Sequence, residues 1–124
     1  MILKERGYHY IDIYGGSGKE HDHFLGNIST ALQWKSKLNI SFFDDFGKYF
    51  FIEEHITIKN VLGRNISLIP FPIASEINTQ GLLHPLKNGV LKFGERIGTR
   101  NKAEEDEIKI SFKGGDLLIY ISNS

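Results

Sequence analysis

The stretch that decides the fold reads EIKISFKGGDLLIYIS and occupies residues 107–122. Apolar and polar residues alternate on both sides of Gly114-Gly115, and an alternation with period two is typical of a β-strand that is buried on one face. Two such runs around a pair of glycines indicate a β-hairpin. The stretch therefore predicts a sheet and contains no motif that specifies a reaction.

The rest of the chain continues this pattern and adds one helical segment. Further strands are expected at residues 8–14, 38–43, 48–59, 66–71 and 89–97, and a loop at residues 79–88. Helical spacing of apolar residues behind Asn27 predicts a short helix over residues 27–38. A strand is the alternative, because Trp34 lies off the helical stripe. Pro70 and Pro72 cannot donate to a ladder, which places the end of strand 66–71 at an edge or outside the sheet.

These elements predict a mainly β (α+β) fold. We expect an antiparallel sheet of six to eight strands, arranged as a sandwich or a partly open barrel, with at most one short helix. Adjacent rings in Phe42-Phe43 and Phe50-Phe51 point to opposite sides of a strand, so the sheet should be covered on both faces. A chain of 124 residues fits a single domain over residues 1–124.

Composition narrows the classes of partner. Fifteen basic and fifteen acidic residues cancel, whereas a protein that binds nucleic acid usually carries a basic field. No run approaches the ~20 apolar residues that cross a bilayer. The chain has no cysteine, which excludes disulfides and thiolate catalysis. We therefore expect a cytoplasmic protein that binds neither nucleic acid nor membrane.

Two groups of acidic side chains are suited to contact a basic protein. They are Glu104, Glu105, Asp106 and Glu107 in one segment, and Asp44 and Asp45 in another. A solvated face is the alternative explanation for such clusters. Three tyrosines, Tyr8, Tyr10 and Tyr14, share one face of the first expected strand and are candidate contact residues. Their rings can equally cover the edge of a core.

Chemical motifs are few. His21 and His23 would project together if their segment were extended, and neutral imidazoles are common metal ligands. The segment at residues 15–19, GGSGK, lacks the remaining residues of a phosphate-binding loop. No serine lies in a nucleophile motif, and no cofactor is expected.

The leading hypothesis is a small non-catalytic protein that covers another protein. Its size and acidic clusters resemble the profile of an inhibitor or bacterial immunity protein that neutralises a basic toxin or nuclease. One alternative is a metal-assisted hydrolase or nuclease that uses His21, Asp22 and His23. Another is a ligand-binding β-sandwich or barrel in which Trp34 and the tyrosines supply ring faces. A homodimer through an exposed edge strand also fits the sequence.

Overall fold

The protein is described from a computed structural model that covers residues 2–4, 10–14, 21–34 and 39–123. Within these ranges it has one helix and ten strands, so the prediction of a mainly β fold with at most one helix is confirmed. The elements are β1 Ile2–Lys4, β2 Tyr10–Tyr14, α1 His21–Trp34, β3 Asn39–Phe43, β4 Gly47–Ile52, β5 His55–Lys59, β6 Asn65–Gln80, β7 Gly89–Lys92, β8 Gly98–Lys102, β9 Glu107–Ser111 and β10 Gly114–Ser122.

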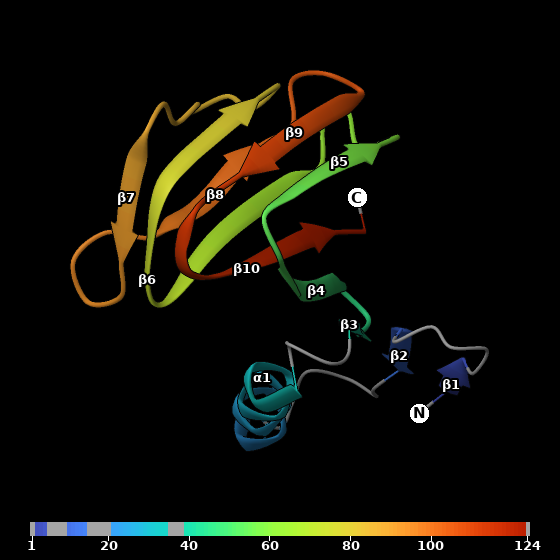
Figure 1. Cartoon of the computed structure of the whole chain (residues 1–124). Coiled ribbons are helices and arrows are strands. Elements are labelled where there is room, and N and C mark those ends of the chain that lie inside the picture. Colours follow the sequence, from blue (N-terminus) through green and yellow to red (C-terminus); the bar gives the residue numbers. More distant parts are fainter. Residues whose placement is uncertain (1, 5–9, 15–20, 35–38, 124) are drawn as a thin grey trace.

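The strands form one curled, mixed sheet that makes a half-barrel (Figure 1). The strand order is β1-β2-β3-β4-β10-β6-β9-β5, and β7 and β8 both pair with β6. All described pairs are antiparallel except β2 with β3, which are parallel and are joined through helix α1. A helical crossover of this kind is the usual connection between parallel strands.

Strand β6 holds the half-barrel together because it belongs to both of its walls. Its first part pairs with β10 and β8, and its second part pairs with β7 and β9. The strand doubles back on itself between these parts, as the bend at the lower left of Figure 1 shows. The predicted end of this strand near Pro70 was wrong.

The ladder around the prolines explains why β6 continues. Pro70 is fully buried opposite Leu117 of β10. On the other side of β6, pairing with β8 stops at Leu68 and pairing with β7 starts at Ile73. The prolines therefore lie in a gap between two partner strands, where a missing N–H costs no ladder bond.

The predicted C-terminal hairpin was also wrong, although both of its strands exist. Strands β9 and β10 do not pair with each other: β9 pairs with β5 and β6, whereas β10 pairs with β4 and β6. The second part of β6 separates them. Gly114 and Gly115 lie opposite Ser75 and Ala74 at the start of β10, so the glycine pair crosses between two walls instead of closing a hairpin.

Hydrophobic side chains pack on both faces of the central strands, as the paired phenylalanines predicted. The larger cluster fills the half-barrel and includes Leu117 and Ile119 of β10. The smaller cluster lies on the other face, where Leu118 packs with Phe42, Phe51 and residues of α1. Phe50 packs against the larger cluster and Phe51 belongs to the smaller one, so adjacent rings do serve opposite faces.

Other predicted boundaries also changed. The strand expected over residues 89–97 ends at Lys92, and β8 follows at residues 98–102. The strand expected over residues 48–59 is broken at Glu53 and Glu54 into β4 and β5. The helix begins at His21 and ends at Trp34, six residues earlier at its start than predicted from the Asn27 cap. In the described part of the chain, no helix has the length and apolarity to cross a membrane.

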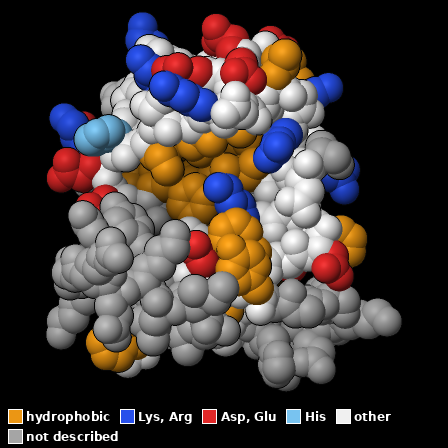
Figure 2. All heavy atoms as spheres, turned by 90° about the vertical axis from the view of Figure 1, so that its right-hand side faces the viewer, with side chains coloured by type: hydrophobic (Ala, Val, Ile, Leu, Met, Phe, Trp, Pro, Cys, Tyr) orange, Lys and Arg blue, Asp and Glu red, His pale blue; other side chains and the backbone are white. Residues whose placement is uncertain are grey.

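One side of the half-barrel is open. Figure 2 shows hydrophobic side chains gathered in a hollow on this side, with Lys and Arg side chains around it. Strand β5 ends the strand order and pairs only with β9 among the described strands. Its Ile56 and Ile58 are half-buried against the larger cluster. The inner surface of β5 is therefore part of the core, although its outer edge is free of a described strand.

Candidate functional site

Two buried polar side chains hold the loop at residues 81–88, which connects β6 to β7 and which we call the β6–β7 loop. Among the described residues, Thr79 and Asn101 are the buried residues with a polar side chain, with exposed fractions of 8% and 5%. Thr79 Oγ1 accepts a hydrogen bond from Leu86 N (2.8 Å), and Asn101 bonds the backbone of His84. Both buried polar groups thus fix the same loop.

The bonds of Asn101 are arranged like those of a peptide group in a strand. Its Oδ1 accepts from His84 N (2.9 Å), and its Nδ2 donates to His84 O (2.8 Å). The same Oδ1 also accepts from Lys102 N at 2.9 Å. A buried amide left unpaired would cost about 1–3 kcal/mol, so these bonds stabilise one arrangement of loop and strand.

Backbone bonds fix the start of the loop against the segment that follows β8. Leu83 N donates to Lys102 O, and Glu104 N donates to Gly81 O, both at 2.8 Å. Gly81 has a φ of +89°, and an added Cβ would lie 2.9 Å from Glu107 O. Glycine is therefore required where the chain leaves β6.

The anchored loop presents side chains to solvent. Leu83 is 45% exposed, and His84 is exposed beside it. Arg100 precedes the anchoring Asn101, is exposed, and has a left-handed backbone with a φ of +60°. Non-glycine residues in this region are uncommon and cluster at functional sites. The side chains of Leu83, His84 and Arg100 are thus exposed on a backbone that hydrogen bonds to Asn101 and Lys102 hold in place.

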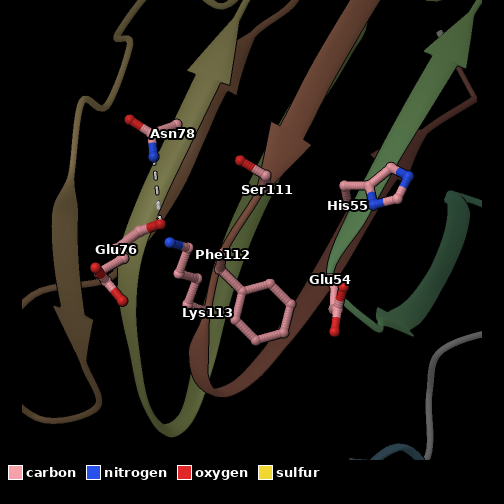
Figure 3. Close-up of a pocket in the computed structure, with 7 residues that line it drawn as sticks. All are labelled: Glu54, His55, Glu76, Asn78, Ser111, Phe112 and Lys113. Atoms are coloured by element: carbon pink, nitrogen blue, oxygen red, sulfur yellow. Dashed lines mark hydrogen bonds between the residues drawn. The ribbon is translucent and has the colours of Figure 1, made fainter.

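A second feature is a pocket of about 390 Å³ on the outer side of the wall formed by β5, β9 and β6 (Figure 3). Asn78, Ser111 and His55 form a row across the three strands, because Asn78 and His55 both lie opposite Ser111. Two carboxylates, an aromatic ring and an ammonium group complete the lining. They belong to Glu54, Glu76, Phe112 and Lys113.

A β-bulge supplies one of the pocket's carboxylates. The pairing of β6 with β7 shifts between Ala74 and Ile77, and Glu76 has a φ of +52°. Ala74 and Ile77 both face the core, so the two residues between them, Ser75 and Glu76, are left outside it. A bulge commonly redirects a side chain in this way.

A third hollow, of about 400 Å³, is apolar and lies between α1 and the bend of β6. It is lined by Leu32, Phe71, Pro72 and Phe93. The ring centroids of Phe71 and Phe93 are 5.5 Å apart, and Phe93 is 54% exposed. The side chains that line this hollow are all apolar, so none of them would orient a polar ligand through a hydrogen bond.

The acidic residues singled out in the sequence fall in two turns. Glu104, Glu105 and Asp106 are exposed between β8 and β9, and Glu107 begins β9. Asp44 has a structural task, because its Oδ1 accepts from Phe46 N (2.8 Å) and Gly47 N (2.9 Å). Asp45 is exposed beside it. A role of these residues in binding stays a prediction.

The candidate tyrosines and histidines are only partly covered by the structure. Tyr14 is 57% exposed and stacks on Phe43 with a centroid distance of 4.8 Å. Tyr10 lies in β2, and Tyr8 lies outside the described residues, as does the glycine-rich segment at residues 15–19.

The metal hypothesis assumed an extended segment around His21 and His23. Both residues lie in the first turn of α1, so the backbone there is helical. A role of His21 and His23 in binding metal stays a prediction. Within the described residues, no group of three or more His, Asp or Glu side chains is placed to hold a metal ion.

Comparison with known proteins identifies the family. Residues 53–117, which include the β6–β7 loop, Asn101 and the pocket of Figure 3, match the family described as "Thiamin pyrophosphokinase, vitamin B1 binding domain". The chain belongs to this family. The match begins just after β4 and ends in β10, so it contains β5 to β9 and the start of β10 and leaves out β1–β4 and α1.

Individual members of the family resemble more of the chain. Thiamine pyrophosphokinase 1 of Oryza sativa subsp. japonica is 32% identical over 121 residues, which covers 91% of this chain and 44% of the rice protein. The structure of thiamine pyrophosphokinase from Bacillus subtilis matches with a TM-score of 0.83 at 28% identity, covering 94% of this chain and 57% of that one. The chain thus spans about half the length of these relatives.

A more distant structure supports the fold alone. Thiamin pyrophosphokinase from Candida albicans has a TM-score of 0.78 at 17% identity and covers 91% of this chain. The fold similarity therefore extends beyond residues 53–117, the part that the family description matches.

The family overturns the leading functional hypothesis. An inhibitor or immunity protein that covers a toxin or nuclease was the wrong expectation, because the matched family and the relatives are thiamin pyrophosphokinases. The partner inferred from the acidic clusters, a basic toxin or nuclease, was wrong for the same reason. Acidic side chains in exposed turns are common on soluble proteins and carried too little information about a partner.

The sequence analysis missed His84, Arg100 and Asn101. One signal was present: in residues 98–103 the polar Asn101 falls on the same face of an alternating strand as Ala103, which is buried. A polar residue on an apolar face indicates either a satisfied buried group or a functional position. The loop that it binds is distant in sequence, so its partner could not be predicted.

Proposed function

We propose that this chain is the thiamine-binding part of a thiamin pyrophosphokinase, an enzyme that transfers a pyrophosphoryl group to thiamine. The observation that carries the proposal is the family match over residues 53–117, which spans the β6–β7 loop and Asn101. The similarity to the Bacillus subtilis enzyme supports it. A cytoplasmic location is part of the proposal and is consistent with a chain that lacks cysteine.

The β6–β7 loop is the proposed contact surface for thiamine. Thiamine consists of an aminopyrimidine ring, a positively charged thiazolium ring and a hydroxyethyl arm. Planar rings bind well to an apolar side chain beside a hydrogen-bonding group, and Leu83 and His84 supply these two kinds of contact. The buried bonds of Thr79 and Asn101 hold the loop before any ligand arrives, which lowers the entropy cost of binding.

Arg100 is suited to the pyrophosphoryl end of the reaction. A guanidinium group binds phosphate oxygens with two parallel hydrogen bonds and stabilises the negative charge on a transferring group. It would repel the thiazolium ring. We therefore place the hydroxyethyl arm toward Arg100 and the rings toward His84.

The pocket of Figure 3 is the competing location for thiamine within the same function. Its Glu54 and Glu76 carry the charge that would attract a thiazolium ring. Lys113 in the same lining offsets part of that attraction. Substitutions at the two locations should affect thiamine binding differently, so one set of variants distinguishes between them.

The experiment is calorimetric titration of the purified chain with thiamine. We expect His84→Ala to weaken binding about tenfold, or ~1.4 kcal/mol, and the double variant Glu54→Gln/Glu76→Gln to bind like the unmodified chain. Loss of binding in the double variant with normal binding in His84→Ala would move the site to the pocket. Absence of heat from millimolar thiamine with the unmodified chain would refute the function.

A second titration tests the role of Arg100. Thiamine pyrophosphate replaces thiamine as the ligand, and Arg100→Ala is compared with Lys102→Ala, which removes a neighbouring exposed positive charge. We expect Arg100→Ala to weaken thiamine pyrophosphate binding and to leave thiamine binding nearly unchanged. If both variants weaken thiamine pyrophosphate binding equally, the contribution of Arg100 is a general attraction between positive charge and the pyrophosphate, and not a specific contact of its guanidinium group.

A further inference from the structure

Asn101 connects two exposed groups that are distant in sequence. Its side-chain amide bonds both the N–H and the carbonyl of His84, and its backbone follows directly after Arg100. The backbone of Asn101 is itself fixed in β8, where it lies opposite Ile66, a residue with no exposed surface. The Asn101 amide therefore joins the backbone of His84 to the residue that follows Arg100, in addition to the backbone bond from Leu83 N to Lys102 O.

Thr79 holds the other end of the β6–β7 loop in a similar way. Its Oγ1 accepts from Leu86 N at 2.8 Å, and its N–H donates to Leu86 O at 2.9 Å. Thr79 is part of β6 and lies opposite Ile110, which is buried in the core. The loop is thus tied at His84 and at Leu86 to two different strands of the half-barrel.

We infer that Asn101 is a positioning residue: through its bonds to His84 it sets the mutual arrangement of His84 and Arg100, and Thr79 assists it from the other end of the loop. The expected effect of Asn101 on thiamine binding rests on the proposed function. The anchoring of His84 by Asn101 can be measured without thiamine.

The first test follows amide hydrogen exchange in Asn101→Leu, which keeps the approximate volume and removes every bond of the amide. The His84 N–H loses its acceptor, so we expect its exchange to become at least tenfold faster relative to the amide of Ile119 in β10. Leu83 N–H bonds a backbone carbonyl and should change less. This comparison lies within one molecule, so a general loss of stability does not produce it.

Matched variants separate positioning from packing. Thr79→Val removes the hydroxyl and should free Leu86 N–H, whereas Thr79→Ser retains the acceptor and should restore its protection. Asn123→Leu removes a comparable amide bond, from Nδ2 to Asp45 O at 3.1 Å, in a turn at the opposite end of β10. It should leave the exchange of His84 unchanged.

The second test measures thiamine affinity of the same variants by calorimetric titration. We expect at least tenfold weaker binding by Asn101→Leu, weaker binding by Thr79→Val, and near-normal binding by Thr79→Ser and Asn123→Leu. Unchanged exchange at His84 in Asn101→Leu, or unchanged thiamine affinity despite faster exchange, would overturn the inference. If the unmodified chain fails to bind thiamine while the exchange results hold, the proposed function fails and the anchoring of the loop stands.

Discussion

Gly115 lies directly against the carbonyl group of Ile73, where β10 begins beside the bend of β6. Its φ is +85°, and an added Cβ atom would overlap the Ile73 oxygen. This close approach lets the chain pass from the wall that contains β9 to the opposite side of β6. The half-barrel therefore depends on the absence of a side chain at this residue.

Gly115→Ala should lower the free energy of unfolding by about 3 kcal/mol, because it combines a left-handed backbone with a clash against a main-chain atom. Gly63→Ala is the matched control: Gly63 has a φ of +83°, but nothing lies within 4 Å of an added Cβ. It should lose only the backbone cost of about 1–2 kcal/mol. Urea unfolding measures both, and equal losses would contradict the contact with Ile73.

Leu117 and Leu118 should contribute similarly to the free energy of unfolding, although they point to opposite faces of β10. Both are buried, Leu117 in the larger cluster and Leu118 in the smaller one. Replacing either by Ala should cost about 2–5 kcal/mol, the usual range for a core leucine. Leu62→Ala, at a side chain that is 63% exposed, should change stability by less than about 0.5 kcal/mol. A small loss at Leu118 alone would mean that the helix-covered face is poorly packed in solution.

The sequence predicted the local features that depend on neighbouring residues. Alternation identified β9 and β10, and adjacent rings at Phe50 and Phe51 indicated a sheet covered on both faces. These predictions succeeded because the side chains of a strand alternate whatever the strand pairs with. The helix was found but displaced, because Asn27 was interpreted as its N-cap although it lies inside the helix, where its Nδ2 donates a hydrogen bond to Tyr49 Oη at 3.2 Å.

Strand pairing could not be predicted in the same way. Gly114-Gly115 has the local signature of a hairpin, yet β6 inserts between the two flanking strands. Only a contact with a residue about forty positions away, Ile73, decides this outcome. The anchored loop is a similar case, since Asn101 and His84 are 17 residues apart and neither alone indicates the other.

Asp44 should stabilise the turn between β3 and β4 through its hydrogen bonds rather than through its charge. Asp44→Ala removes the acceptor for Phe46 N and Gly47 N and should lower the free energy of unfolding by about 1–2 kcal/mol. Asp44→Asn retains an acceptor oxygen and should lose less than half as much. Urea unfolding of the two variants at neutral pH provides the measurement. Equal losses would show that the carboxylate charge is the stabilising feature.

Tyr49 should make the protein less stable in alkaline solution. Burial raises the pKa of its phenol, a hydrogen bond from Asn27 opposes this change, and the charge of Asp44 adds to it. Below the ordinary pKa of ~10, the phenol is neutral in both states, and its stabilising contribution is complete. Above that value the unfolded chain loses the proton first, so stability falls as pH rises toward the folded pKa.

Urea unfolding between pH 9 and pH 11, roughly the range around the ordinary tyrosine pKa, measures whether the free energy of unfolding falls as the pH rises. Tyr49→Phe should lose less stability across the range than the unmodified chain, because one of the two tyrosines whose pKa burial raises, Tyr49 and Tyr120, is gone. Tyr14→Phe, at a ring that is 57% exposed, should follow the unmodified chain. Asp44→Asn should lower the phenol pKa of Tyr49, read from tyrosinate absorbance, because it removes the neighbouring negative charge. A Tyr49→Phe variant that declines as steeply as the unmodified chain would refute burial of this phenol as the cause.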